Sequence, residues 1–212
     1  MRILKRFTSK KNCVFLLEDR DQTAVYKCFN DPGHYEKEYN YYKMLRQTDL
    51  PVPKLLAHNH DHHTMLLEYL GDQTALDELE SYEQNHCTTE ALTLLISIFN
   101  WLDKFHALPT IKENQLAFSD LSIRNFIRKD HVLYGIDFES IEKGNFARDV
   151  GNLIAMYLNY DVKYSPFKIQ VSSQLKQYIL SNSPLSLCAI DSAIHSSTKA
   201  IHARRNRSCD NH

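Results

Sequence analysis

The sequence predicts an α+β fold with two lobes, in which a five-stranded antiparallel sheet with one helix precedes a short, mainly helical lobe. Apolar and β-branched runs, separated by polar turns, fill most of residues 1–70. Apolar residues at helical spacing dominate the chain after Gly71. A chain of 212 residues can form one sizeable core or two small lobes that share a cleft. We therefore assign residues 1–70 to an N-terminal lobe and residues 71–212 to a C-terminal lobe of one domain.

The N-terminal lobe is predicted to begin with three consecutive strands, in the clusters ILKRF, CVFLL and TAVYKCF. After the turn NDPG, the segment HYEKEYNYYKMLRQ carries Tyr35, Tyr39, Tyr42 and Leu45 at helical spacing. We predict a helix there, which LPVPK ends because proline disfavours helical backbone before it. Strands at KLLAH and TMLLEYL complete the sheet.

The C-terminal lobe is predicted to open with a helical pattern from Thr74 to Leu108. Its apolar stripe has a period of 3.6 residues and consists of Leu92, Leu95, Ile96, Phe99, Leu102 and Phe105. Short strands at NFIR and VLYGI and helices at FARDVGNLIAMYL, FKIQVSSQLKQYIL and LCAIDSAIHSSTKAIHARR follow. The last residues, RRNRSCDNH, are interpreted as a polar tail in which Arg204, Arg205 and Arg207 are solvated.

Composition and charge exclude several classes of function. The formal charge is −1, so no overall field favours nucleic acid, and any anionic ligand must be held locally. Five cysteines without CxxC spacing argue against a disulfide framework and a zinc site, and favour a reducing cytoplasm. The start, MRILKRFTSKK, lacks the apolar region of a signal peptide, and Asn100 and Asp103 interrupt the most apolar helical stretch. We expect a cytoplasmic protein without a membrane span.

The candidate chemistry lies in SDLSIRNFIRKDHVLYGIDFE, residues 119–139. Asp120 and Asn125 form D-x-x-x-x-N, a pattern that alone is common by chance. The apolar strand VLYGI then delivers Asp137 twelve residues after Asn125. Phosphoryl transfer requires Mg²⁺ held by carboxylate and amide oxygens, and a carboxylate that orients the attacking hydroxyl. These three side chains supply such groups.

A cation for nucleotide phosphates is predicted in the strand VYK, which presents Lys27. Glu38 lies eleven residues further on, in the following helix, where it can pair with Lys27. Glu36 would replace Glu38 if the phase of the helix were shifted. The alternative for Lys27 is an edge-strand lysine that points to solvent.

Several motifs carry a resemblance to a known family: LPVPKLL, MLLEYLGD, WLDKFHAL, IDFE and RDVGNL. Over residues 13 to 160 the chain resembles the protein-kinase-like superfamily, specifically its aminoglycoside phosphotransferase and choline kinase branch. The resemblance implies a bilobal protein-kinase-like fold with ATP between the lobes. It also implies that Lys27 contacts the α and β phosphates, that Glu38 orients Lys27, and that the segment from Glu68 to Leu70 offers backbone groups to adenine.

The same resemblance implies roles for residues of the second lobe. Asp120 would be the catalytic base or would position the hydroxyl, and Asn125 and Asp137 would be the magnesium ligands. Asp149 would brace the catalytic loop.

Two departures from the family pattern matter. Phe118 and Ser119 stand where these families usually have His or Asn near the catalytic Asp, so the hydrogen bonds that steady the loop must come from elsewhere. The turn TSKKNC has no glycine to let backbone N–H groups approach phosphates. Its Lys10 and Lys11 are either side-chain cations for the phosphates or solvated turn residues.

The leading prediction is an ATP- and Mg²⁺-dependent phosphotransferase that moves the γ-phosphoryl group to a hydroxyl of a small molecule. Three alternatives stay open: a small atypical protein kinase, a catalytically inactive kinase-like protein that binds or regulates a partner, and an unrelated α+β fold with accidental motifs. The sequence does not name the acceptor.

Overall fold

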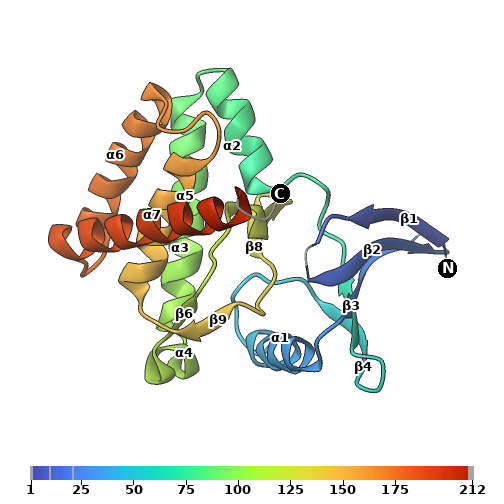
Figure 1. The fold of residues 1–212 in the computed structure, drawn as a ribbon. Helices are drawn as coiled ribbons and strands as arrows, with labels where there is room; N and C mark the ends of the chain where they lie inside the picture. Colours follow the sequence, from blue (N-terminus) through green and yellow to red (C-terminus); the bar gives the residue numbers. More distant parts are fainter. Residues whose placement is uncertain (1, 10, 21, 210–212) are drawn as a thin grey trace. The chain divides into compact units, whose positions relative to one another are not determined.

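The computed structural model describes residues 2–9, 11–20 and 22–209, and it confirms the predicted α+β fold class (Figure 1). The chain divides into two compact units. The first contains Met1–Asp72 and Ile127–Glu139, and the second contains Gln73–Phe126 and Ser140–His212. The segment 127–139, predicted as part of the C-terminal lobe, thus joins the first unit. There the Gly135 N–H donates to the carbonyl of Pro51 (3.1 Å).

The first unit is built on a five-stranded antiparallel sheet. In spatial order its strands are β1 (Arg2–Phe7), β2 (Asn12–Asp19), β3 (Gln22–Phe29), β5 (Thr64–Glu68) and β4 (Leu55–Asn59). The segment 127–139 adds a hairpin of β7 (Phe126–Lys129) and β8 (Val132–Gly135).

The helix of the first unit, α1 (Pro32–Leu45), starts shortly after β3 because its first turn is capped. Asp31 accepts hydrogen bonds from the N–H groups of Gly33 and His34, and Pro32 provides the fixed φ that suits a first helical position. The helix buries Tyr35, Glu38, Tyr42 and Leu45. Glu38 therefore occupies the buried face in place of the predicted Tyr39, which is only half-buried. A buried carboxylate requires a partner nearby.

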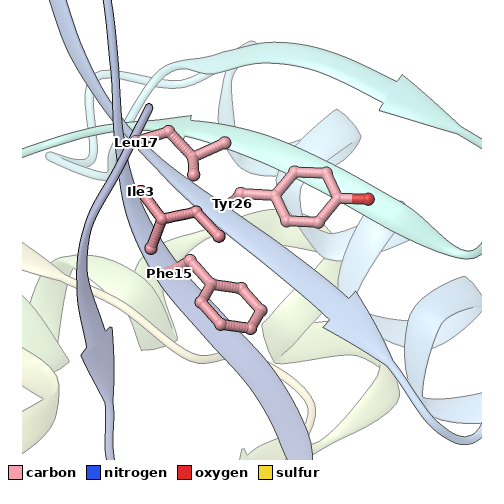
Figure 2. A pocket seen from close by; sticks show the side chains of 4 residues that line it. All are labelled: Ile3, Phe15, Leu17 and Tyr26. Atoms are coloured by element: carbon pink, nitrogen blue, oxygen red, sulfur yellow. The ribbon is translucent and has the colours of Figure 1, made fainter. Parts of the chain in front are cut away.

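An open apolar pocket lies on one face of this sheet, lined by Ile3, Phe15, Leu17 and Tyr26 (Figure 2). Phe15 pairs with Tyr26 across β2 and β3, whereas Val14 pairs with Lys27. Successive residues of a strand point to opposite faces of the sheet. The pocket therefore lies on the face opposite to Lys27 and does not belong to the site described below.

The second unit is mainly helical. Its helices are α2 (Ala75–Gln84), α3 (Thr88–Ala107), α4 (Pro109–Asn114), the 3₁₀ helix η1 (Ile123–Asn125), α5 (Phe146–Asn159), α6 (Pro166–Asn182) and α7 (Leu187–Cys209). A small antiparallel sheet joins β6 (Leu116–Phe118) to β9 (Ile141–Lys143). Within the described part of the chain, none of the helices has the length and apolarity needed to cross a bilayer.

Three details of the second unit differ from the sequence prediction. The single helical pattern from Thr74 to Leu108 is two helices, α2 and α3, and the connection includes His86 with a positive φ of 55°. On α3, Leu92 and Ile96 are only half-buried. Ala91, Leu94 and Ile98 complete the buried face. The predicted polar tail was wrong from Arg204 to Cys209, where α7 continues. Residues 210–212 of that tail lie outside the described residues.

Candidate active site

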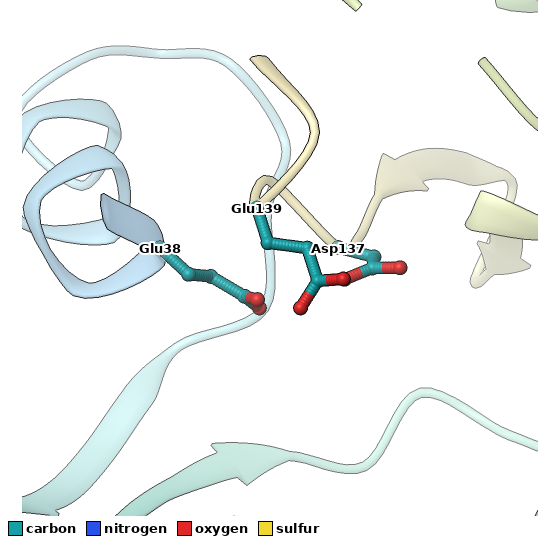
Figure 3. Close-up of side chains that lie close together, drawn as sticks. All are labelled: Glu38, Asp137 and Glu139. Carbon is teal, nitrogen blue, oxygen red and sulfur yellow. The ribbon is translucent and has the colours of Figure 1, made fainter. Parts of the chain in front are cut away.

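Lys27 lies among three carboxylates of the first unit. Its Nζ donates to Oε2 of Glu38 (2.6 Å) and to Oδ1 of Asp137 (2.8 Å), and lies 3.8 Å from Oε2 of Glu139. Strand β3 supplies Lys27, α1 supplies Glu38, and the loop after β8 supplies the other two. Figure 3 shows the three carboxylates converging. Lys27 is 7% exposed and Glu38 is 1% exposed. The structure thus forms the expected Lys27–Glu38 pair, and Glu36 is exposed.

The loop that carries Asp137 is held in an unusual backbone conformation. Asp137 has a positive φ of 66°, and a sparsely populated conformation of this kind costs about 1–3 kcal/mol for a non-glycine residue. The next residue, Phe138, is fully buried and packs edge-on against Tyr42 of α1, with the ring centroids 5.0 Å apart. The buried ring of Phe138 therefore fixes the carboxylates of Asp137 and Glu139, which flank it in the sequence. Strain of this kind is typical of functional sites.

Glu139 is a member of the cluster that was not predicted from the sequence. Its Oε2 accepts a hydrogen bond from Nδ2 of Asn12 (2.7 Å), and its Oε1 forms an ion pair with Nζ of Lys11 (3.1 Å). Lys11, for which a phosphate contact and a solvated position were both open, thus has a carboxylate partner. Lys10 lies outside the described residues. The D-x-E spacing in IDFE is the sequence signal that could have identified Glu139.

The cluster carries an excess of negative charge, since three carboxylates share two ammonium groups. Burial alone would lower the pKa of Lys27, but the charges of Glu38 and Asp137 outweigh it and hold that pKa above its usual value. Burial raises the pKa of Glu38 to about 7, because the attraction of Lys27 only partly offsets it. Both groups therefore hold protons more tightly than they would in water. The cluster favours additional positive charge.

These residues fit a divalent cation. Carboxylate oxygens of Glu38, Asp137 and Glu139 lie within 4.8 Å of one another. Hard oxygen ligands of this kind suit Mg²⁺, which usually binds one or two carboxylates together with phosphate oxygens. Among the residues that the structure describes, Oδ1 of Asn12 has no hydrogen-bond partner and is buried, which leaves an oxygen ligand beside Glu139.

The residues predicted to contact adenine lie at the end of β5. The side chain of Glu68 accepts a hydrogen bond from Nζ of Lys129 (3.0 Å), and the same ammonium donates to the carbonyl of Tyr69 (3.3 Å). Leu70 is buried. Lys129 therefore ties this segment to β7. The contacts of Glu68 and Leu70 with a nucleotide stay predictions.

The predicted catalytic loop belongs to the second unit, and hydrogen bonds fix its first residues. The buried Asp149 accepts from the N–H of Phe118 (3.0 Å) and from Nε2 of His106 (2.8 Å). Burial raises the pKa of Asp149, and the bond from His106 opposes that effect. Ser119 donates from its N–H (2.9 Å) and from Oγ (2.8 Å) to the carbonyl of Ser140. Asp149 thus fixes the start of this loop, as the family resemblance implied.

Asp120 follows directly in this loop, with a side chain that is 59% exposed. Its Oδ1 accepts a hydrogen bond from Nη1 of Arg204 in α7 (2.5 Å). Asn125 ends η1 and is half-buried. Lys27, Glu38 and Asp137 are thus brought together in the first unit, whereas Asp120 and Asn125 belong to the second unit.

Comparison with known proteins identifies the family. A family model described as the RIO domain matches residues 32–169. A search of curated proteins found no match. RIO proteins are an atypical protein-kinase-like family, so the predicted superfamily is confirmed. The aminoglycoside phosphotransferase and choline kinase branch finds no support. Because the match spans well over half of its length, the chain belongs to the RIO family.

Proposed function

We propose that the protein is an atypical protein kinase, which transfers the γ-phosphoryl group of ATP to a hydroxyl of a protein in a Mg²⁺-dependent reaction. The observation that carries the proposal is the buried Lys27 held between Glu38 and Asp137 in a chain of the RIO family. A buried ion pair is a poor source of stability, because apolar residues of similar volume serve a fold as well or better. A function in binding phosphates explains why this lysine is present.

The nucleotide would bind through side chains whose donors and acceptors suit it. The Lys27 ammonium has three N–H donors, of which Glu38 and Asp137 take two. One donor is left for a phosphate oxygen. We propose that Asp137, in the carboxylate cluster with Glu38 and Glu139, is a ligand of Mg²⁺, which when bound would neutralise charge on the phosphates. The predicted role of Asn125, which belongs to the second unit, as a second ligand stays a prediction from the sequence. Glu139 would hold Asn12 and Lys11 near the same site.

The acceptor is proposed to be a protein hydroxyl, and Asp120 would orient it and take its proton. The small-molecule hydroxyl that the sequence first predicted has less support, because the RIO family consists of atypical protein kinases. One observation favours the catalytically inactive alternative. The turn before β2 has no glycine, and its Lys11 is engaged by Glu139. A protein that only binds nucleotide or a partner could tolerate both features.

Incubation of the purified chain with γ-labelled ATP tests this proposal, with the chain itself and casein as protein acceptors. We expect Mg²⁺-dependent label on serine or threonine hydroxyls of protein. Nucleotide binding without transfer of label would contradict the proposed activity and favour the inactive alternative. Faster labelling of an aminoglycoside or choline in parallel reactions would instead favour a small-molecule acceptor.

A further inference from the structure

We infer that Arg204, in α7, is a positioning residue for Asp120. This inference rests on the proposed function, because it concerns the group that would take the proton of the acceptor hydroxyl. Nη1 of Arg204 donates to Oδ1 of Asp120 over 2.5 Å. The two residues are 84 positions apart in the chain, and Arg204 lies beyond residues 32–169, which the RIO domain model matches. The contact thus joins a residue inside the matched region to one outside it.

Asp120 needs a partner of its own because the other bonds of the loop fix its backbone and not its carboxylate. Asp149 and Ser140 accept from Phe118 and Ser119, which precede Asp120. The carboxylate itself is largely exposed, and a short exposed side chain samples several rotamers. A guanidinium is always charged and is planar, so it orients a carboxylate better than a flexible ammonium does.

Helix α7 packs on α5, and Arg204 lies near the C-terminal end of α7. Figure 1 shows α7 in the second unit. A Cβ atom on Gly151 of α5 would lie 2.5 Å from Cβ of Ala193, so the two helices are in close contact there. Further along, Nε2 of His202 donates to Oδ1 of the buried Asn159 (3.1 Å). Ile201 is buried as well. Since His202 is two residues before Arg204, the position of this arginine is set by tertiary packing.

The contact occupies only one oxygen of the Asp120 carboxylate. Arg204 engages Oδ1 of Asp120, which leaves Oδ2 and its lone pairs for the acceptor hydroxyl. In the transfer step, the acceptor oxygen forms a bond to the γ-phosphorus while the bond from that phosphorus to the bridging oxygen of ATP breaks. The electron pair leaves with ADP, and the hydroxyl proton passes to Asp120. Arg204 would keep the carboxylate turned toward that proton.

The test is the kinetics of label transfer to casein by Arg204→Ala, Arg204→Lys and a control, Lys199→Ala. Lys199 is an exposed cation on the same helix. We expect kcat of Arg204→Ala to fall roughly 10- to 100-fold, within the factor that a general base contributes, with KM for MgATP changed less than about twofold. Arg204→Lys should retain part of the activity. Added guanidinium ion at millimolar concentration should restore part of kcat in Arg204→Ala, and Lys199→Ala should match the wild type.

Several results would overturn the inference. An unchanged kcat in Arg204→Ala would show that the contact is incidental, and a higher kcat would mean that α7 inhibits the loop. A lower kcat without rescue by guanidinium, together with a lower melting temperature, would indicate a structural role only. In each case the active wild type would leave the proposed function intact. A wild type that transfers no label would overturn the proposed function and this inference together.

Discussion

Lys27→Met is expected to abolish MgATP binding and to lower the free energy of unfolding by about 3 kcal/mol, because it leaves buried carboxylates without their cation. Glu38 is 1% exposed and would then face Asp137 and Glu139 without a positive charge between them. Protonation of Glu38 limits this loss of stability, because it removes one of the unpaired charges. Denaturant unfolding monitored by circular dichroism measures the stability, and titration calorimetry measures the binding.

The stability loss in Lys27→Met should depend on pH with a definite sign. Burial already raises the pKa of Glu38 to about 7, and loss of Lys27 raises it further. A carboxyl with a raised pKa favours the folded state in its protonated form, so stability falls as pH rises through that pKa. We therefore expect a larger loss at about pH 8.5 than at about pH 5.5.

The double variant Lys27→Met with Glu38→Leu is the matched control for this experiment. Replacing both partners of a buried pair by apolar residues often restores stability, but it cannot restore a phosphate ligand. We expect stability near that of the wild type and no MgATP binding. Recovery of binding in the double variant, or unchanged binding in Lys27→Met, would contradict the role of Lys27.

Asp120→Asn should lower kcat for label transfer by a factor on the order of 10²–10⁴, the usual contribution of a general base. Asparagine keeps the shape of the side chain but cannot accept the proton. MgATP affinity should stay close to that of the wild type. Stability should also change little, because Asp120 and Arg204 are 59% and 46% exposed, and an exposed pair contributes no more than about 1 kcal/mol.

Asp103→Asn controls for the loss of one carboxylate, since Asp103 is exposed on α3 of the same unit. It should transfer label at the rate of the wild type. Full turnover in Asp120→Asn would assign the proton transfer to another group and remove the basis for the role of Arg204.

The Lys27–Glu38 pair could be predicted from the sequence because both partners lie on elements with strong local signals. An apolar strand pattern presents Lys27. Glu38 lies in a helix whose buried face recurs at spacings of three and four residues. Asp137 could also be predicted, because it comes directly after the apolar strand VLYGI.

Glu139 and Arg204 could not be found in this way, because long-range contacts define their positions. Glu139 joins the cluster through the left-handed backbone of Asp137 and the burial of Phe138 against Tyr42. Arg204 reaches Asp120 only because α7 packs on α5. The place of residues 127–139 in the first unit is equally non-local. Short motifs such as IDFE indicated the superfamily, but they did not distinguish its branches. The cytoplasmic location stays a prediction.

Calorimetric titration of ATP into the wild type and Asp137→Asn, with and without Mg²⁺, tests the proposed nucleotide site most directly. Asparagine tolerates the positive φ of position 137, so the change removes charge and spares the backbone. Asp130→Asn is the matched control, because Asp130 is also an aspartate with positive φ and is exposed in the β7–β8 turn.

The titration should be run at about pH 8, above the raised pKa of Glu38, so that the carboxylates are ionised. We expect Mg²⁺-dependent binding of ATP to the wild type and to Asp130→Asn. In Asp137→Asn the affinity should fall at least about 10-fold, as expected for loss of a charged metal ligand, and the dependence on Mg²⁺ should disappear. Absence of binding to the wild type at millimolar MgATP, or equal Mg²⁺-dependent binding to Asp137→Asn, would contradict the proposed site.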